Sequence, residues 1–234
     1  SRCATRSVAV ALPPSGRCGA NPGPPDTRQT GRVKVHLVDG TYELFRQHFG
    51  MAVRHGDPAP NAAALGVVAS TLQLVQQGAT HLGVASDHVI ESFRNDLYAG
   101  YKTSEGMEPV LLEQIPVMEH LLALAGFTVW PMVEHEADDA LGSAAAAAEA
   151  DQRVEQVLIV TPDKDLGQCV RGTRVVQYDR RKDEIIDEAA VTSTQLNAQA
   201  NHVSLRSGLP ELDISRWALS RVEIKPMPSP SPLR

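Results

Sequence analysis

The sequence predicts an α/β fold, with a mostly parallel central sheet flanked by helices. Three observations indicate it: short β-prone apolar runs recur along the chain, longer helix-like runs separate them, and acidic residues follow four of the strand-like runs. Alternating strands and helices favour parallel pairing, because each helix returns the chain to the edge of the sheet where the next strand begins.

The strand-like and helix-like runs follow one another in a regular order. The expected strands are residues 33–38, 81–85, 127–130, 156–160, 173–178 and 184–186. The expected helices are residues 42–49, 61–77, 110–126 and 140–150. We expect Asn61 to cap the second helix and Gly78 to end it, Pro116 to kink or break the third helix, and Pro131 to close the third strand.

Composition divides the 234 residues into three segments. Residues 1–31 are rich in Pro, Gly, Arg and Ser without hydrophobic periodicity, and we expect them to be disordered. Residues 32–191 hold the periodic elements and form the predicted domain, while residues 192–234 form a tail with several prolines. No apolar run approaches the roughly 20 residues that span a bilayer, so we expect a cytoplasmic protein without a membrane partner. We also expect a monomer.

The charge is concentrated in the predicted domain. The net charge of the whole chain is −6, and residues 1–31 carry +3 and residues 192–234 carry +2, which leaves −11 for the middle. A middle so acidic argues against a simple nucleic-acid-binding module with a basic face. It is compatible with a nuclease, whose carboxylates hold metal ions that reverse the local field. The three cysteines lack a C-x-x-C pattern, so neither a disulfide framework nor a zinc site is indicated.

Acidic side chains stand at or just past the ends of four successive strands. They are Asp39, Asp87, the group Glu136, Asp138 and Asp139, and the pair Asp163 and Asp165. Because the carboxyl ends of parallel strands meet at one edge of a sheet, we expect these acids to lie together. Capping of the helix that follows is the alternative for residues 136–139, but one acid suffices for a cap. A divalent cation converts the repulsion among three acids into attraction.

A site made of carboxylates selects Mg²⁺ or Mn²⁺ over zinc or copper. Two such ions about 3.5 to 4 Å apart are a common device for phosphodiester hydrolysis. Residues 93–102 mix aromatic side chains with cations, which suits bases and phosphates, although an amphipathic helix with a solvated basic face explains the mixture equally. Lys102 lies after a separate helix-like stretch, so we expect it to act on substrate charge alone.

Two other functional classes stay open at this point. A phosphoacceptor signalling domain also carries an acidic Mg²⁺ pocket and a lysine, but it predicts paired acids after the first strand, where only Asp39 stands. A catalytically weak or inactive remnant that binds metal or DNA is the other alternative. No Walker A or G-x-G-x-x-G signature indicates a nucleotide-dependent enzyme.

Five motifs together resemble the bacterial 5′-3′ exonucleases, a family similar to the N-terminal nuclease domain of DNA polymerase I and to flap endonucleases. The motifs are Val38-Asp39-Gly40, Ala85-Ser86-Asp87, residues 93–97 with Tyr101-Lys102, Glu136-Ala137-Asp138-Asp139 and Thr161-Pro162-Asp163-Lys164-Asp165. The resemblance implies a PIN-like domain with two divalent ions that cuts DNA at free 5′ ends and at 5′ flaps. It implies metal ligation by Asp39, Asp87, Glu136, Asp138, Asp139, Asp163 and Asp165. It also implies catalytic roles for Lys102, Arg94, Asp138 and Asp163, and substrate contacts for Tyr101, Lys102 and Arg94.

The sequence departs from the family pattern in two places. Thr103-Ser104-Glu105-Gly106 stands where polymerase-linked members carry an arginine soon after the lysine. Residues 192–234 contain neither the Gly-Asp-x-x-Asp pair that completes the second metal site nor the helix-hairpin-helix that grips duplex DNA. We therefore expect a weakly occupied second ion site, weak DNA affinity and slow cleavage.

Overall fold

The computed structural model describes residues 33–55, 59–98 and 100–200. The expected disorder of residues 1–31 and the proline-containing tail after residue 200 lie outside these ranges. Within the described ranges, no helix has the length and apolar character needed to cross a membrane.

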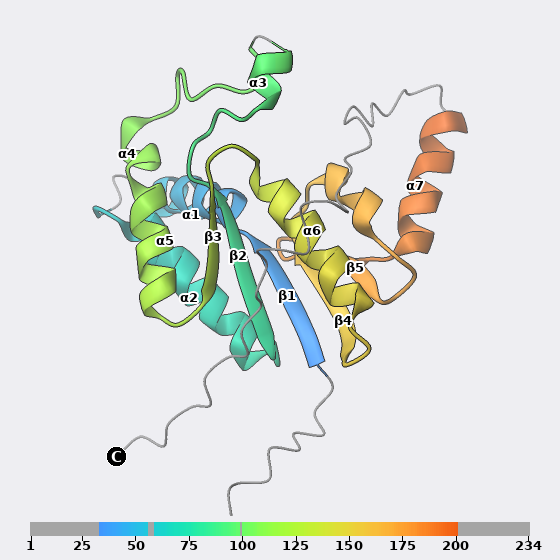
Figure 1. The fold of residues 1–234 in the computed structure, drawn as a ribbon. Helices are drawn as coiled ribbons and strands as arrows, with labels where there is room; N and C mark the ends of the chain where they lie inside the picture. Colours follow the sequence, from blue (N-terminus) through green and yellow to red (C-terminus); the bar gives the residue numbers. More distant parts are fainter. Residues whose placement is uncertain (1–32, 56–58, 99, 201–234) are drawn as a thin grey trace, which may run out of the picture. The chain divides into compact units, whose positions relative to one another are not determined.

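Six strands form one sheet in the order β3-β2-β1-β4-β5-β6 (Figure 1). The strands are β1 Val33–Asp39, β2 His81–Asp87, β3 Thr128–Met132, β4 Val154–Val160, β5 Val175–Asp179 and β6 Glu184–Ile186. Strands β1 to β5 pair in parallel, and β6 pairs antiparallel with β5. The predicted mostly parallel α/β sheet is therefore confirmed.

Helices cover both faces of the sheet (Figure 1). They are α1 Gly40–His55, α2 Ala62–Gln76, α3 Arg94–Leu97, α4 Pro109–Leu112, α5 Gln114–Leu124, α6 Ala137–Ala150 and α7 Glu188–Ala200, with the 3₁₀ helix η1 Lys164–Cys169. Helices α1, α2 and α5 share a core cluster on one face, and α6 builds the cluster on the other. The central strand β1 has β2 on one side and β4 on the other, so the carboxyl ends of β1 and β4 mark the point where the strand order reverses.

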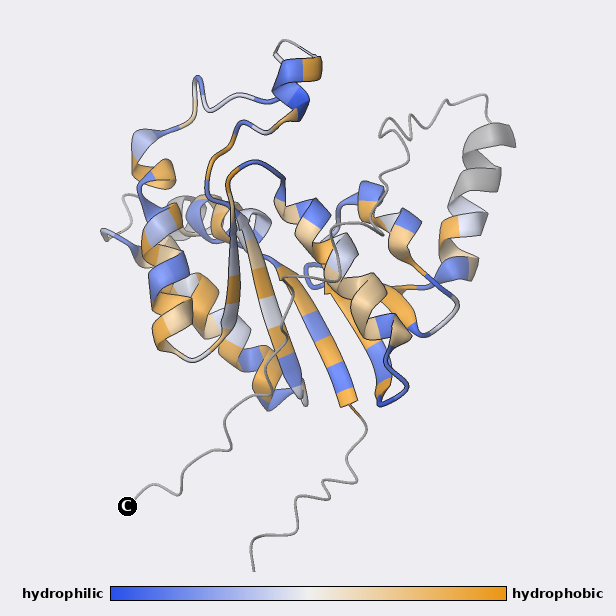
Figure 2. Ribbon diagram, in the orientation of Figure 1, coloured by the Kyte–Doolittle hydropathy of each residue, from blue (hydrophilic) through white to orange (hydrophobic). Residues whose placement is uncertain are grey.

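Strand β1 is covered by helices on both faces. Its residues alternate between hydrophobic and hydrophilic along much of the strand (Figure 2). Val35 and Leu37 pack in the cluster under α6, whereas Val38 packs in the cluster under α1, α2 and α5. Alanines dominate the buried side of α6, and these short side chains let the helix approach the sheet closely.

Two glycines allow close approaches around β2. A Cβ on Gly40, the first residue of α1, would lie 2.8 Å from the carbonyl oxygen of Ala85. A Cβ on Gly83 would overlap the indole ring of Trp130 in the neighbouring strand. The absence of a side chain at Gly40 lets α1 begin directly against β2, which brings the ends of β1 and β2 together.

The predicted cap of α2 is wrong. Asn61 has a left-handed backbone (φ 61°), and its side chain makes no capping hydrogen bond. The acceptor comes instead from α5, because Gln114 Oε1 accepts hydrogen bonds from the backbone N–H groups of Ala63 at 3.1 Å and Ala64 at 3.3 Å. A side chain 50 residues away therefore satisfies the start of the helix.

The prediction for Pro116 is confirmed, because the stretch is divided into α4 and α5 at Glu113. Pro116 lies in the first turn of α5, and without an N–H it cannot donate to the carbonyl of Leu112, the last residue of α4. The prediction for Pro131 is wrong. Pro131 does not end β3, which continues to Met132. Because β3 is an edge strand, the missing N–H of Pro131 is tolerated there.

Candidate functional site

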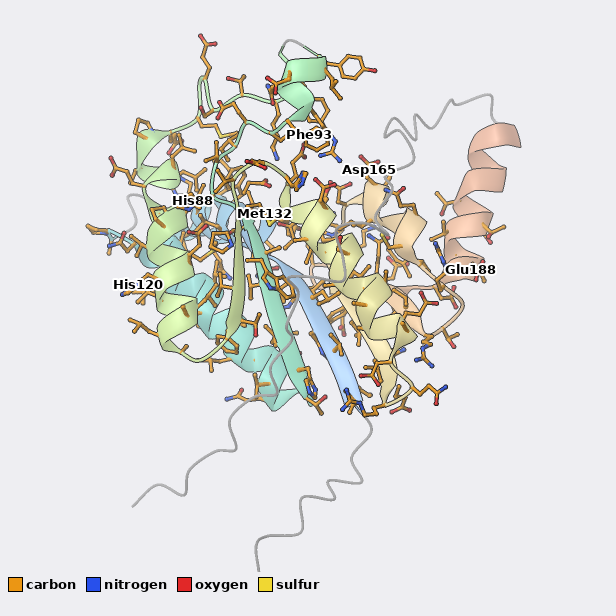
Figure 3. The ribbon with its side chains drawn as sticks, in the orientation of Figure 1. His88, Phe93, His120, Met132, Asp165 and Glu188 are labelled. Atoms are coloured by element: carbon orange, nitrogen blue, oxygen red, sulfur yellow. The ribbon has the colours of Figure 1, made fainter. Side chains whose placement is uncertain are left out.

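The predicted acids gather at the carboxyl edge of the sheet. Asp39 and Asp87 are the last residues of β1 and β2, Glu136 precedes α6, and Asp163 follows β4. Phe93, next to α3, and Asp165, in η1, lie beyond the same edge (Figure 3). The topology thus brings together residues separated by up to 124 positions in the chain, and their contacts show what each one does.

Asp39 is buried and held by two internal donors. Its Oδ1 accepts a hydrogen bond from the backbone N–H of Tyr42 at 2.9 Å, and its Oδ2 accepts one from the Thr161 hydroxyl at 3.2 Å. Burial raises the pKa of Asp39 to about 6, and the charges of Asp87 and Asp163 act in the same direction. Thr161 was not among the predicted site residues. Its position two residues before Asp163 is the sequence signal that could have identified it as one.

Asp87 connects three elements at the same edge. Its Oδ1 accepts a hydrogen bond from the backbone N–H of Ala137, the first residue of α6, at 2.7 Å. Its Oδ2 accepts one from the Lys102 ammonium at 2.8 Å, and its own backbone N–H donates to the Thr41 hydroxyl at 2.8 Å. Both carboxylate oxygens of Asp87 are therefore engaged by groups of the protein itself.

Asp138 lies where the charges of the other acids converge. Burial raises its pKa to about 8, and the charges of Asp39, Asp163, Asp87 and Glu136 add to the effect. A carboxylate placed among four others is destabilised in its charged form, and a nearby cation offsets this repulsion. Asp138 is therefore the centre of the cluster formed by Asp39, Asp87, Glu136, Asp138 and Asp163, which we call the acid cluster.

Asp163 and Asp165 form the exposed side of the site. Asp163 Oδ1 accepts a hydrogen bond from the backbone N–H of Asp165 at 2.9 Å, which caps η1. Gln177 Nε2 donates to the backbone carbonyl of Asp163 at 2.6 Å and so ties this loop to β5. Burial and the charge of Asp163 raise the pKa of Asp165.

Glu136 and Asp139 serve the start of α6, as the capping interpretation predicts. Asp139 Oδ2 accepts a hydrogen bond from the backbone N–H of Glu136 at 3.0 Å. Both oxygens of Asp139 also accept from Arg94, and Glu136 Oε1 accepts from Arg94 at 2.9 Å and from Ser92 at 2.7 Å. Capping and acid clustering therefore coexist in residues 136–139, and Asp139 is the acid most fully committed to a structural contact.

Arg94 is not on a solvated basic face. Its side chain is only 6% exposed, lies over the Phe93 ring at 4.7 Å, and is paired with Glu136 and Asp139. The amphipathic-helix interpretation of residues 93–102 is wrong, because α3 is only four residues long and buries its arginine. Arg94 instead anchors this segment to the start of α6.

Lys102 points into the acid cluster. Its ammonium lies 2.8 Å from Asp87 Oδ2 and 3.7 Å from Glu136 Oε2, and its side chain is 31% exposed. Partial burial opposes its charge, but the attraction of Asp87, Glu136 and Asp138 together outweighs this and raises the pKa of Lys102. Lys102 therefore contacts the acids of the site as well, and its role toward substrate charge stays a prediction. By contrast, Tyr101 beside it is 43% exposed and available to a ligand.

The donor set fits a hard divalent cation, but Asp39, Asp87, Glu136 and Asp163 already accept hydrogen bonds from the protein. Within the described ranges, no three Asp, Glu, His or Cys side chains are arranged to hold an ion. Carboxylate oxygens are nevertheless the ligands that Mg²⁺ and Mn²⁺ prefer. No ion site is arranged because the carboxylates of Asp39 and Asp87 already accept hydrogen bonds from other groups of the protein. The donors are Tyr42, Thr161, Ala137 and Lys102.

Known proteins share this sequence pattern and this fold. The family model of the 5′-3′ exonuclease N-terminal, resolvase-like domain matches residues 34–195. DNA polymerase I of Mycobacterium leprae is 32% identical over 151 residues, covering 62% of this chain and 16% of that protein. The thermostable DNA polymerase I of Thermus thermophilus is 33% identical over 142 residues, covering 58% of this chain and 16% of that protein. The chain thus spans much less than two thirds of the length of these relatives.

A solved structure supports the fold independently. A mutant of T5 5′-exonuclease superposes with a TM-score of 0.50 at 18% identity, covering 67% of this chain and 54% of that chain. This likeness confirms the predicted PIN-like arrangement of a mostly parallel sheet between helices. Because the family model matches more than half of the residues, this chain belongs to the family of the 5′-3′ exonuclease N-terminal, resolvase-like domain.

Proposed function

We propose that this chain is a divalent-metal-dependent 5′ nuclease that hydrolyses phosphodiester bonds in DNA with a free 5′ end or a 5′ flap. The observation that carries the proposal is the convergence of four carboxylates, those of Asp39, Asp87, Glu136 and Asp163, on the buried side chain of Asp138, whose pKa is raised to about 8 first by burial and then by these charges. Structural ion pairs do not require such an arrangement, whereas a hard cation does. Membership in the exonuclease family supports the choice of a phosphodiester substrate.

In this proposal, Asp39, Asp87, Glu136, Asp138, Asp163 and Asp165 hold Mg²⁺ or Mn²⁺. Such ions lower the pKa of bound water and stabilise the leaving oxygen of the displaced phosphodiester. The protein fixes the acids in advance: the Tyr42 N–H and the Thr161 hydroxyl orient Asp39, and the Ala137 N–H orients Asp87. Pre-oriented ligands matter because small displacements of a catalytic group cost much of the rate.

The segment around α3 supplies the substrate contacts in this proposal. Tyr101 is exposed beside the acid cluster, where its ring stacks on a base of the DNA. Lys102 meets the phosphate next to the scissile bond. Arg94 takes a different part from the one predicted: it is a positioning residue, because its guanidinium is buried in ion pairs with Glu136 and Asp139.

We expect turnover by residues 1–234, assayed by themselves, to be slow. Residues 192–234 contain no Gly-Asp-x-x-Asp pair to supply the second ion site and no helix-hairpin-helix to neutralise DNA phosphates. Phosphate neutralisation supplies most of the affinity of a protein for duplex DNA, so affinity falls when it is missing. Joining residues 1–191 to a complete C-terminal segment of the family should raise the cleavage rate, and equal rates for the two chains would contradict this expectation.

A cleavage assay with a labelled 5′-flap DNA tests the proposed function. The wild-type chain should release short 5′ products in Mn²⁺ or Mg²⁺ and none in EDTA, while Asp138→Asn should lose ion-dependent cleavage. Lys34→Met is the matched control, because Lys34 is exposed at the opposite end of β1. Product lengths separate cleavage at the flap junction from stepwise removal of nucleotides. Equal ion-dependent cleavage by wild type and Asp138→Asn would exclude the assigned site.

A further inference from the structure

The ammonium of Lys102 already occupies a cation position in the acid cluster. It donates to Asp87 Oδ2 at 2.8 Å, lies 3.7 Å from Glu136 Oε2, and is also attracted by the charge of Asp138. The backbone carbonyl of Lys102 accepts a hydrogen bond from Asn95 Nδ2 at 2.6 Å, which holds the chain at this point. The lysine is therefore fixed at its backbone while its long side chain reaches the acids.

This contact explains why the acids are close together yet form no ready ion site in the described part of the chain. Asp87 has two oxygens: one accepts from the Ala137 N–H at the start of α6, and the other accepts from Lys102. The bond to Ala137 is buried and belongs to the helix start. The Lys102 side chain is 31% exposed and reaches Asp87 from outside the sheet, so it is the partner that can leave.

We propose that Lys102 is the built-in counter-ion of the acid cluster, and that a divalent ion and this ammonium replace each other on Asp87. The inference rests on the proposed metal-dependent function and adds a competitor for the ion within the same chain. An ammonium is a compact charge on a flexible stem, which suits a group that must be exchanged. Without it, an empty cluster of five carboxylates would repel itself.

The exchange couples ion binding to substrate binding. When an ion takes Asp87, the released ammonium is free to turn toward the exposed side, where Tyr101 lies. A DNA phosphate on that side would then pair with the Lys102 ammonium, which Asp87 neutralised before the ion bound. Ion and phosphate therefore favour each other, and the coupling has the same size in both directions.

The proposal predicts the sign of one mutational effect. Lys102→Met keeps most of the length of the side chain but removes its charge, so the ion no longer competes with an ammonium, and the affinity of the protein for the ion should rise. A lysine that only meets substrate would leave ion affinity unchanged, and a lysine that only holds the fold would lower it when removed. The three roles therefore differ in the direction of a single measured constant.

Calorimetric titration of the full chain with MnCl₂, without DNA, measures that constant. Lys102→Met should bind Mn²⁺ about tenfold more tightly than wild type, the effect of one favourable charge contact. Lys34→Met, a lysine outside the site, should bind as wild type does. Thermal unfolding gives a second readout: without Mn²⁺ the Lys102→Met protein should melt below wild type, and Mn²⁺ should raise its melting temperature by more.

The outcomes separate this inference from the function on which it rests. If both proteins bind Mn²⁺ with the same affinity, or Lys102→Met binds it more weakly, the counter-ion role is overturned while the metal-dependent function stands. If neither protein binds Mn²⁺ at millimolar concentration, both proposals are overturned. Should Lys102→Met prove unfolded, Lys102→Gln is titrated in its place, with the same expected gain in affinity.

Discussion

Arg94 and Asp139 form a two-pronged ion pair, with Nη1 to Oδ2 at 3.0 Å and Nη2 to Oδ1 at 2.8 Å. Arg94 lies in the segment that leaves β2, and Asp139 lies in the first turn of α6, so the pair joins the segment around α3 to the helix that carries Asp138. The position of Asp138 in the site thus depends on the ion pair that Asp139 makes with Arg94.

Breaking this pair should destabilise the protein. Both side chains are at most 10% exposed, so Arg94→Met leaves the buried carboxylates of Glu136 and Asp139 without the guanidinium that neutralises them, which costs about 3 to 5 kcal/mol. Urea unfolding measures the loss. The control is Arg153→Met, because Arg153 is 85% exposed in its pair with Asp151 and its removal should be silent. Equal stability of the two variants would show that the buried pair contributes nothing.

Adding a single methyl group at Gly83 should strain the sheet. The Cβ of Gly83→Ala would overlap the ring of Trp130, and overpacking of this kind typically costs about 1 to 3 kcal/mol. Thermal unfolding checks the loss. Trp130→Leu in the same chain should restore part of the stability, because the smaller side chain makes room for the methyl group. Strictly additive losses in the double variant would argue against a clash between the two residues.

Gln114 should be required for the start of α2. Gln114→Met removes the acceptor of the Ala63 and Ala64 N–H groups and should lower the free energy of unfolding by about 1 to 2 kcal/mol. Hydrogen exchange should accelerate at those two amides more than in the middle of α2. Gln114→Glu keeps the oxygen acceptor but loses the hydrogen bond from Gln114 Nε2 to the Val110 carbonyl, so exchange at Ala63 and Ala64 in this variant separates the two contacts of Gln114. Unchanged exchange at Ala63 and Ala64 in Gln114→Met would refute the capping role.

His36 should make the fold sensitive to acid. This buried residue of β1 has its pKa lowered to about 4, chiefly by burial and then by the charge of Lys34, with a smaller contribution from Arg180. Because the folded pKa lies below the ordinary value of 6.5, the unfolded chain takes up the proton first. The stability from neutral His36 is therefore complete above about pH 6.5 and lost between about pH 6.5 and 4, amounting to about 3 kcal/mol.

Urea unfolding at several pH values measures this loss. The comparison is with His36→Leu, which has no proton to take up at this position, so the difference in stability between the two proteins isolates the histidine. That difference is needed because Asp39 and Asp138 have raised pKa values and act in the opposite direction as pH falls. Parallel pH profiles for the two proteins would show that His36 is not the cause.

Local patterns in the sequence were sufficient to predict the sheet and the clustering of the acids at one edge of it. Strand ends are marked by short apolar runs, and parallel topology then places Asp39, Asp87 and Asp163 at one edge without further information. The position of Lys102 was harder to predict from the sequence. Residues 93–102 have a composition typical of a helix, whereas the structure folds only Arg94–Leu97 into one. The direction in which Lys102 points depends on that irregular segment.

The details that the sequence did not predict are contacts between distant segments. Asn61 stands where a cap is common, yet Gln114 supplies the acceptor, and nothing near Asn61 indicates a partner 53 residues later. Pro131 is typical of a strand end, and only the position of β3 at the edge of the sheet makes it acceptable within the strand. Arginine is a residue type usually found at the protein surface. Arg94 is buried because it pairs with Glu136 and Asp139, which lie 42 and 45 residues later in the chain.

The two outer strands of the sheet also bear on how the protein avoids self-association. One outer strand, β3, carries Pro131, which has no N–H to offer a neighbouring molecule. The other, β6, is three residues long, begins with Glu184, and follows Lys182 and Asp183. Short, charged or proline-containing edges discourage the addition of a strand from another molecule. Neither rim of the sheet is therefore a good template for β-aggregation, even when the protein is concentrated.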